Sequence, residues 1–322
     1  MNVKKKFGYL LLMLLLVFPL AACNSSKGST DSGADQAKIA VLLWSREFEF
    51  MVALDEAMQK KGEELGVDVE VLDGQSDSQM QTRQIEDSIA KQVDAIIIAP
   101  VNSDELVPGV KRANEAGIPV LTVDGVLSKG ADIKGAIAFD NKAAGKMAAE
   151  FIKKTVGEGE ILEATGAPGT YHATLRGSGF KDEMKKSDAF KVYSKNANWD
   201  AQQAQSITAD AVTAKPGIKA IFSHNDDMIR GINGGLNQIG KNKEIAVVGT
   251  DGTPLALERI RTDKQLATVD QDPYKMGAAA LQAAVDVIKG KEIPKEQFVE
   301  PKMITKENVD DPELWGNKFD KK

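Results

Sequence analysis

The sequence predicts an α/β protein of two lobes, each built on a doubly wound parallel sheet. From Lys38 onward, short runs rich in β-branched residues alternate with stretches of helical spacing, which is typical of parallel sheets wound with helices. The runs are apolar without a period of two, as expected where helices cover both faces of a sheet. About 285 residues follow position 37, which is more than one core usually holds, so we expect two lobes.

The first 22 residues have the pattern of a lipoprotein export signal. Three lysines precede an apolar stretch that is too short to span a bilayer comfortably and that ends in Leu-Ala-Ala-Cys. Cys23, the only cysteine of the chain, stands where such a signal is cut and a lipid attached, and with no second cysteine no intramolecular disulfide can form. We therefore expect a lipid anchor on the extracytoplasmic face of the cell membrane; an uncleaved anchor or an unmodified Cys23 is the alternative.

Residues 23–37 are small and polar without apolar periodicity, and we expect them to be a flexible tether. The chain holds 41 basic and 47 acidic residues, and loss of the signal would remove three lysines and no acidic residue. Nucleic-acid binding needs clustered Lys and Arg. The acidic balance therefore argues against a nucleic-acid partner.

Ten strands are expected, five in each half of the folded chain, and each is followed by a stretch of helix-like spacing. The clearest helix opens at Asp272, a favourable N-cap followed by a proline, and ends at Gly290. Gly66, Gly117 and Gly240 stand where left-handed helix caps are expected. The predicted strands lie within residues 38–44, 67–73, 94–100, 118–124, 134–140, 159–166, 190–195, 218–224, 244–251 and 265–271.

No linker rich in Gly, Pro or Ser separates the two halves, so we expect the lobes to be joined by several crossings of the chain. These are placed near residues 139–140, near residue 270 and near residue 300. The first lobe would then comprise residues 38–139 plus 271–299, and the second lobe 140–270 plus 300–322. The three crossings would form a hinge.

Polar and aromatic residues collect where the predicted strands end, and ligands of open α/β sheets bind beyond these carboxyl ends. Carboxylates accept hydrogen bonds from sugar hydroxyls, Arg, Asn and Gln donate to them, and aromatic rings cover the apolar faces of a sugar ring. No nucleophile has a base beside it, so we do not expect an enzyme. The candidate ligand-binding residues are Trp44, Phe48, Phe50, Asp124, Arg176, Trp199, Asn225, Asp251 and Gln271.

The charged candidates also have purely structural explanations. Asp124 and Asp251 could cap the helices that follow their strands, because Asp is a favoured N-cap. Arg176 could form an ion pair with Asp182 or Glu183 on its own predicted helix.

The segment Trp-Ser-Arg-Glu-Phe-Glu-Phe-Met, residues 44–51, is unusually aromatic for a junction between a strand and a helix. Its rings either fill the core or face a bound molecule. Phe48 fits both explanations equally well, and Trp199 could be an ordinary partly buried residue. Met51 has the spacing of a core residue on a helix.

We expect no cofactor and no metal. His172 and His224 are the only histidines, and they lie far apart without Cys or spaced carboxylates around them, although His224 adjoins Asn225 and could reach the site. The glycines of residues 231–235 fall inside a predicted helix rather than between a strand and a helix, which argues against a dinucleotide site. No Walker-type phosphate-binding motif is present.

Six motifs occur together in one order: Thr-Val-Asp-Gly, Leu-Arg-Gly-Ser-Gly-Phe, Asn-Trp-Asp, His-Asn-Asp-Asp-Met, Val-Val-Gly-Thr-Asp-Gly-Thr-Pro and Thr-Val-Asp-Gln-Asp-Pro. In this order and spacing the mature chain resembles the ribose- and galactose-type substrate-binding proteins of bacterial ABC importers. The resemblance implies the type 1 periplasmic binding protein fold, whose two lobes close on a sugar or polyol. It also implies a monomeric receptor that delivers its ligand to a permease with ATPase subunits, and that the candidate residues occupy ligand positions.

The chain departs from the family at two positions of the first lobe. Phe48 stands where the family usually has Asn or Asp, and Gly125 stands where Arg or Lys commonly follows the Asp. We therefore expect a ligand with fewer hydroxyls on that side, or an acyclic or deoxy compound. The alternative function is a sensory receptor for a sugar-like signal. A sugar-responsive repressor would carry an N-terminal helix-turn-helix where this sequence has the export signal, so we set that function aside.

Overall fold

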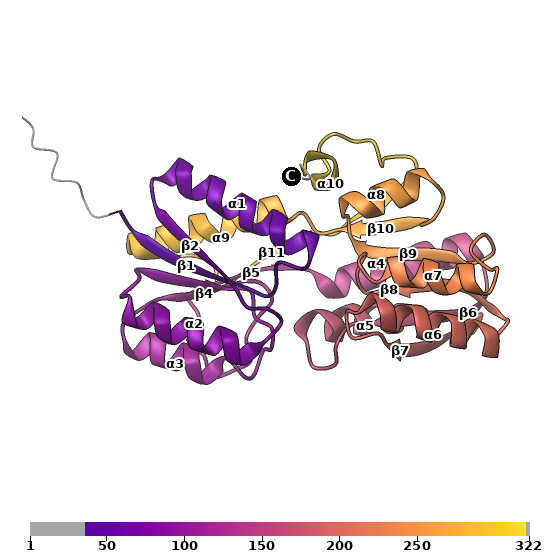
Figure 1. The fold of residues 1–322 in the computed structure, drawn as a ribbon, viewed down its shortest axis with the longest axis horizontal. Helices are drawn as coiled ribbons and strands as arrows, with labels where there is room; N and C mark the ends of the chain where they lie inside the picture. Colours follow the sequence, from indigo (N-terminus) through magenta and orange to yellow (C-terminus); the bar gives the residue numbers. More distant parts are fainter. Residues whose placement is uncertain (1–35, 320–322) are drawn as a thin grey trace, which may run out of the picture. The chain divides into compact units, whose positions relative to one another are not determined.

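The structure is a computed structural model, and it describes residues 36–319. These residues belong to one compact unit that contains two sheets, and each sheet with its helices is called a lobe below (Figure 1). The predicted signal peptide, Cys23 and nearly all of the predicted tether lie outside the described residues.

The first lobe contains a six-stranded sheet in the order β11-β5-β4-β3-β1-β2, and all of its neighbouring strands are parallel. Its strands are β1 (Lys38–Leu43), β2 (Asp68–Asp73), β3 (Ala95–Ile98), β4 (Val120–Asp124), β5 (Ala136–Phe139) and β11 (Glu296–Val299). Its helices are α1 (Glu49–Leu65), α2 (Ser78–Ala90), α3 (Val107–Glu115) and α9 (Pro273–Ile288).

The second lobe contains a six-stranded sheet in the order β12-β10-β9-β8-β6-β7, in which only the edge strand β12 is antiparallel to its neighbour. Its strands are β6 (Gly159–Thr165), β7 (Phe190–Asn196), β8 (Ile218–Ser223), β9 (Ala246–Asp251), β10 (Ala267–Asp270) and β12 (Lys302–Thr305). Its helices are α4 (Asn141–Val156), α5 (Tyr171–Met184), α6 (Ala201–Ala214), α7 (Ile229–Gln238), α8 (Pro254–Arg261) and α10 (Trp315–Lys318).

Both faces of each sheet are buried, which explains the continuous apolar runs of the sequence. On β1, Ile39, Val41 and Leu43 pack in the cluster that includes α1 and α9, whereas Ala40 and Leu42 pack with α2 and α3. Successive side chains of a strand point to opposite faces, so neither set of positions can be polar. The fold class predicted from the sequence is confirmed.

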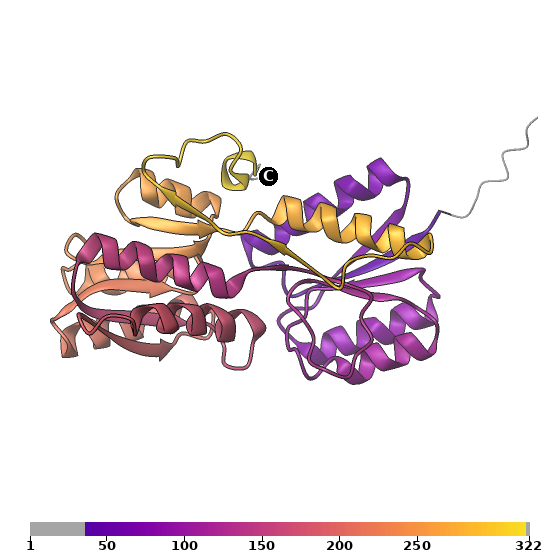
Figure 2. The same ribbon diagram turned by 180° about the vertical axis from the view of Figure 1, so that it is seen from behind.

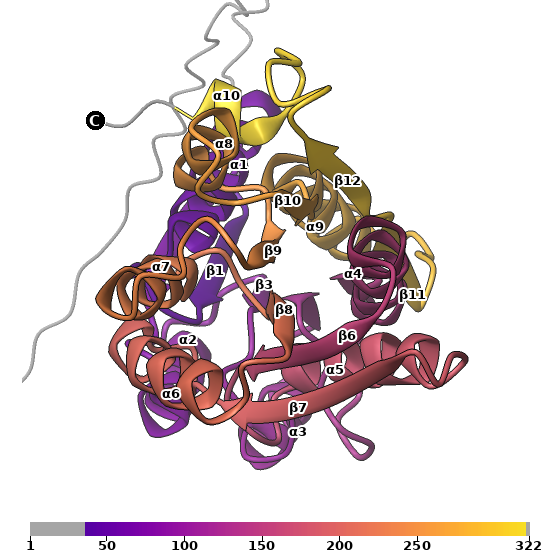
Figure 3. The ribbon, with the colours of Figure 1, turned by 90° about the vertical axis from the view of Figure 1, so that its right-hand side faces the viewer.

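The second sheet is covered in the same way, with α4 and α5 packed together and α6 and α7 packed together (Figure 3). Leu162 and Ala164 of β6 belong to the cluster that includes α6 and α7. Phe180 of α5 stacks on Phe222 of β8, with ring centroids 4.6 Å apart. These layers fix the ends of the strands, where the candidate residues lie.

Helix boundaries follow the capping residues that the sequence predicted. The carboxylate of Asp272 accepts a hydrogen bond from the backbone N–H of Lys275 and caps α9, and Gly290 follows that helix with a φ of 74°. Gly66 caps α1 in the left-handed conformation, which a residue without Cβ adopts at no steric cost.

Two details of the predicted strand pattern were wrong. Residues 125–135, which connect β4 directly to β5, contain no helix among the described residues, although each predicted strand was expected to lead into one. The short strands β11 and β12 were not predicted, because each has only four residues and neither forms an apolar run. β11 alternates exposed with partly exposed positions, and in β12 only Ile304 is fully buried. Only residues 300–301 separate these two strands, which belong to different sheets (Figure 2). The exact lobe boundaries stay a prediction.

Within the part of the chain that the structure describes, no helix combines the length and the apolar character that crossing a bilayer requires.

Gly231 and Gly234 of α7 offer a matched test of helix packing in the second lobe. A Cβ at Gly231 would overlap the backbone carbonyl oxygen of Ala201, where α6 begins, whereas a Cβ at Gly234 would meet the flexible side chain of Gln205 at 3.2 Å. We expect Gly231→Ala to lower the free energy of unfolding by about 1–3 kcal/mol. Gly234→Ala should be neutral or stabilise by up to about 1 kcal/mol through helix propensity. Urea denaturation measures both, and equal effects would contradict the packing described here.

Candidate functional site

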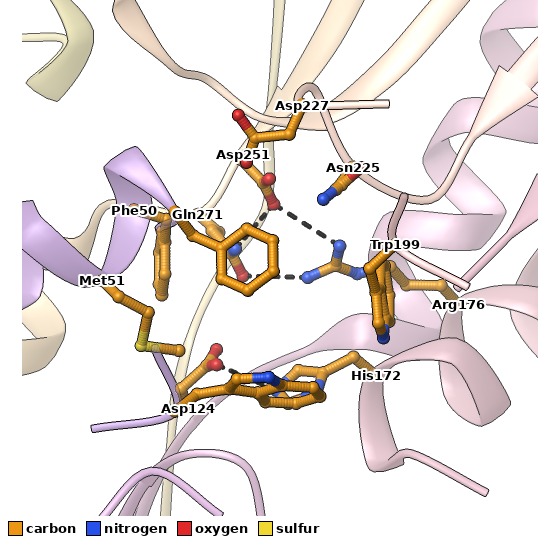
Figure 4. Close-up of a pocket in the computed structure, with 12 residues that line it drawn as sticks. Phe50, Met51, Asp124, His172, Arg176, Trp199, Asn225, Asp227, Asp251 and Gln271 are labelled. Atoms are coloured by element: carbon orange, nitrogen blue, oxygen red, sulfur yellow. Dashed lines mark hydrogen bonds and ion pairs between the residues drawn. The ribbon is translucent and has the colours of Figure 1, made fainter. Parts of the chain in front are cut away.

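The ends of the strands enclose a cavity that all nine candidate residues line (Figure 4). Counted out to its mouth, the space between the side chains is about 420 Å³. Three further residues line it, namely Met51, His172 and Asp227. The sequence therefore identified nine of the twelve lining residues, while their contact with a ligand stays a prediction.

The aromatic loop between β1 and α1 forms the wall that the first lobe contributes. Trp44 follows β1 and is 8% exposed, and Phe50 lies on the first turn of α1 and is 4% exposed. Phe48 is the N-cap of α1, but it makes no side-chain hydrogen bond to the helix. A residue that could have capped the helix is thus replaced by a ring that lines the cavity. Met51 is buried in the core and also lines the cavity.

Arg176 lies at the centre of the polar wall and is only 2% exposed. Its Nε donates to Oδ1 of Asn141 at 2.7 Å, and one Nη donates to Oε1 of Gln271 at 3.1 Å. The other Nη donates to the backbone oxygen of His224 and lies 3.4 Å from Oδ1 of Asp251. The guanidinium group is thereby fixed from three directions.

The alternative explanation of Arg176, an ion pair on its own helix, is wrong. Asp182 instead lies 3.5 Å from Lys142, and Glu183 pairs with lysines. Helix α5 can hold Arg176 close to α4 because Gly145 of α4 leaves room for the carbonyl group of Arg176.

Asp251 ends β9 with its carboxylate directed at Arg176. Its Oδ1 accepts a hydrogen bond from Nε2 of Gln271 at 2.7 Å, and its backbone oxygen accepts one from the indole of Trp315. Burial raises the pKa of Asp251 well above its usual range; Arg176 opposes this shift and neighbouring carboxylates add to it. Asp251 does not cap α8, because the N-cap of that helix is Thr253.

Asp226, fully buried behind the cavity, holds the ends of three strands together. Its carboxylate accepts hydrogen bonds from the backbone N–H groups of Gly252 at 2.9 Å and Thr253 at 3.2 Å. It also accepts from the hydroxyl of Thr268 at 2.8 Å and from Nε2 of Gln265 at 2.8 Å. Burial raises the pKa of Asp226 to about 6 despite these donors. Asp226 therefore positions the neighbouring Asn225 and Asp251 rather than lining the cavity.

Asp227 lines the cavity beside this network. Burial raises its pKa to about 7, and the nearby charges of Asp226 and Glu49 add to the shift. Sequence reasoning missed this residue, although it lies within the His-Asn-Asp-Asp-Met motif next to a candidate. The motif was the available signal.

Asp124 of the first lobe and His172 of the second lobe meet across the cavity. Nε2 of His172 lies 3.0 Å from Oδ2 of Asp124, although without the alignment of a hydrogen bond. Gly125 makes this possible, because a Cβ there would come within 3.3 Å of the imidazole ring. Asp124 caps no helix, since β4 leads to β5. No spacing in the sequence pointed to His172, because its partner is 48 residues away and on the other lobe.

Trp199 and Asn225 complete the wall of the second lobe. Trp199 has a φ of 61° and lies against Gly166, where any Cβ would overlap the indole ring. Its ring meets Trp44 edge to face, with centroids 6.4 Å apart. Oδ1 of Asn225 accepts a hydrogen bond from the backbone N–H of Met228, and Figure 4 shows the amide nitrogen turned toward the cavity.

His224, which the sequence allowed to reach the site, does not line the cavity. It is fully buried, and its Nε2 lies 3.1 Å from Oε1 of Glu163. Burial lowers the pKa of His224, and Glu163 opposes this shift. Among residues 36–319, no group of three or more His, Cys, Asp or Glu side chains is arranged to hold a metal ion.

A model of the periplasmic binding protein domain matches residues 39–292. The chain belongs to this family. It is similar to the ribose import binding protein of Bacillus subtilis (strain 168), with 33% identity over 290 residues that cover 88% of this chain and 94% of that protein. The family resemblance inferred from the motifs is thus confirmed.

Solved structures of this periplasmic binding protein family support the same conclusion. An ABC transporter solute binding protein from Bacillus halodurans C-125 with bound myo-inositol has a TM-score of 0.82 and 27% identity, covering 88% of this chain and 98% of that one. Another, from Actinobacillus succinogenes 130z with bound D-allose, has a TM-score of 0.80 and 29% identity. The match covers 85% of this chain and 99% of that one. The first of these relatives is named as an import binding protein and the other two as solute binding proteins of ABC transporters, and none of the three is named as an enzyme or as part of a sensor.

Asp227 should make the stability of the ligand-free protein depend on pH. Its pKa of about 7 in the folded protein exceeds the ordinary 3.8, so between these values the folded protein holds a proton that the unfolded chain releases. This stabilisation is complete below about pH 4 and is lost as the pH rises through about 7. Asp227→Asn should raise the Tm at pH 7.5 by roughly 2 °C or more, and the gain should vanish near pH 4.

Thermal unfolding followed by circular dichroism at both pH values measures this difference. Asp210→Asn, a change at an exposed position of α6, is the matched control and should leave the profile unchanged. A gain for Asp227→Asn that is the same at both pH values would contradict the electrostatic origin.

Proposed function

We propose that this protein binds a monosaccharide or polyol in the cavity and delivers it to an ABC permease with ATPase subunits. The observation that carries the proposal is the combination of Arg176, Asp251 and Gln271, hydrogen-bonded to one another, with indole and phenyl rings in one cavity. Paired donors and acceptors match vicinal hydroxyls, and the rings match the apolar C–H faces of a sugar. Family membership and the three relatives support the same reading.

Binding requires no chemical step. The cavity is lined from both sheets, so a ligand that contacts both lobes favours the conformation in which they approach. Each hydrogen bond to a charged side chain contributes roughly 1.5–3 kcal/mol net. The lobes and the ligand lose conformational, translational and rotational freedom on binding, which opposes this gain. A few such hydrogen bonds together with ring contacts suffice for a dissociation constant of about 1 μM, which is a binding free energy of about −8 kcal/mol.

The two lobes contribute unequally to this binding. The first lobe contributes Asp124 and the aromatic loop, whereas four polar candidate residues come from the other elements. These are Arg176 on α5, Asn225 after β8, Asp251 at the end of β9 and Gln271 after β10. We propose that the ligand docks first on the second lobe and that the first lobe then closes over it. The hinge would be the three crossings, with lobe boundaries at residues 139–140, 270–271 and 299–300.

The proposals on the anchor and the location rest on the sequence alone. We propose that residues 1–22 are an export signal, that Cys23 carries a lipid after cleavage, and that residues 23–37 tether a monomeric receptor to the extracytoplasmic face of the membrane. The lysines, the apolar stretch and the small residues before Cys23 support this proposal.

Calorimetric titration of the protein with pentoses, hexoses, inositols and sugar alcohols tests the proposed function. Binding of at least one compound near the micromolar range, with no turnover, is expected. No binding across the panel would refute the proposal.

Asp251→Asn should weaken binding at least about 100-fold, because it replaces an acceptor oxygen of the carboxylate that faces Arg176, Gln271 and the ligand hydroxyls with an N–H donor. Phe50→Leu keeps an apolar side chain in the core and should weaken binding only about three- to tenfold, mainly by faster release. Surface plasmon resonance measures both rates. The opposite ranking would show that the first lobe, and not the second, is the docking surface.

Cys23→Ser should release the exported protein from the membrane, because a serine cannot receive the thioether-linked lipid. Fractionation of cells followed by immunoblotting measures the shift from the membrane fraction to the soluble fraction. Lys27→Ser, a change within the predicted tether, is the control and should leave the protein on the membrane. Retention of the Cys23→Ser variant on the membrane would favour an uncleaved anchor.

A further inference from the structure

The two lobes line the cavity with side chains of different chemistry. The first lobe contributes Trp44, Phe48, Phe50 and Met51, all from the junction of β1 and α1, and a single polar side chain, Asp124. No other residue of that lobe lines the cavity within the part of the chain that the structure describes. The second lobe and the segment after β10 contribute the amide, guanidinium and remaining carboxylate groups, with His172 and Trp199.

Asp124 is the one carboxylate that the described part of the first lobe offers a ligand. Its Oδ2 lies 3.0 Å from His172, and its Oδ1 is buried without a hydrogen-bond partner. The indole nitrogen of Trp44 is buried and unpaired in the same way, and the rest of this ring presents apolar surface to the cavity. Gly125, next along the chain, has no side chain to donate a hydrogen bond, and the imidazole of His172 fills the space beside it. Apart from Asp124 and one indole N–H, the first lobe therefore has no side-chain group on this wall that can pair with a hydroxyl.

A hydroxyl that faces such a wall loses its hydrogen bonds to water and finds no replacement, whereas a C–H or methyl group there gains contact with the rings. The difference between the apolar wall of the first lobe and the polar wall of the second lobe therefore selects the chemical class of the ligand. We infer that the bound sugar turns a hydroxyl-poor edge toward the first lobe, and that deoxy sugars bind more tightly than the parent sugars that carry the extra hydroxyl. This inference rests on the proposed function and specifies its ligand.

Calorimetric titration with matched pairs tests the inference directly. Suitable pairs are D-galactose with D-fucose, L-mannose with L-rhamnose, and D-ribose with 5-deoxy-D-ribose, because the members of each pair differ by a single hydroxyl. In the pair that binds most tightly, the deoxy member is expected to bind about tenfold tighter or more, since an unpaired buried hydroxyl costs roughly that much.

A change at Phe48 should remove this preference. Phe48→Asn places an amide that can donate and accept hydrogen bonds on the apolar wall, and Asn is a favoured N-cap, so the start of α1 should not be weakened. The preference for the deoxy member should fall about tenfold, toward equal binding. Phe298→Asn makes the same chemical change on β11, where the ring is 46% exposed and outside the cavity, and it should leave the preference unchanged.

The possible results separate this inference from the proposed function. If the parent sugar binds at least as tightly as its deoxy partner in every pair that binds, the inference is wrong and the proposed function stands. The same holds if inositols or sugar alcohols bind and no deoxy sugar does. If nothing in either panel binds, the proposed function fails and the inference fails with it. An equal loss of preference in Phe48→Asn and Phe298→Asn would also overturn the assignment of Phe48.

Discussion

A buried guanidinium is costly unless its N–H groups are paired, and at Arg176 this constraint organises the whole polar wall. Its partners come from α4, from the end of β8, from the end of β9 and from the segment that follows β10. Elements far apart in the sequence are thereby held at one point. The close approach of α4 and α5 at Gly145 serves the same arrangement, because it fixes the backbone that carries Arg176.

The carboxylates around this cation outnumber it. Asp226, Asp227 and Asp251 each have a raised pKa, because burial disfavours their charged forms, and for Asp227 and Asp251 neighbouring carboxylates add to the shift. The carboxylate of Asp226 accepts hydrogen bonds from backbone N–H groups and from Thr268, so its role is to stabilise the fold around the cavity. Asp227 and Asp251 instead face the cavity. Hydroxyl groups of a ligand are donors that would relieve this excess of acceptors, which gives binding an electrostatic contribution beyond shape.

The sequence predicted the features that repeat and missed those that depend on one contact between distant residues. Continuous apolar runs identified ten strands, because parallel sheets bury both faces, and the strand ends then pointed to nine lining residues. Strands β11 and β12 were not predicted, because they are short and partly exposed. His172 could not be found, because its importance arises from the space at Gly125 on the other lobe. The aromatic loop was recognised, but the sequence could not tell that Phe48 both packs against the core and lines the cavity.

The connection between the sheets also bears on how the chain folds during synthesis. Helix α9, which packs on α1 and covers one face of the first sheet, and β11, which completes that sheet, both come after all of β6 to β10 in the sequence. Until nearly the whole protein has emerged from the ribosome, this apolar face is therefore covered only in part, by α1. Contacts between such distant segments slow folding. A chain that folds late remains unfolded for longer, and an unfolded chain is the form that can pass through a translocation channel.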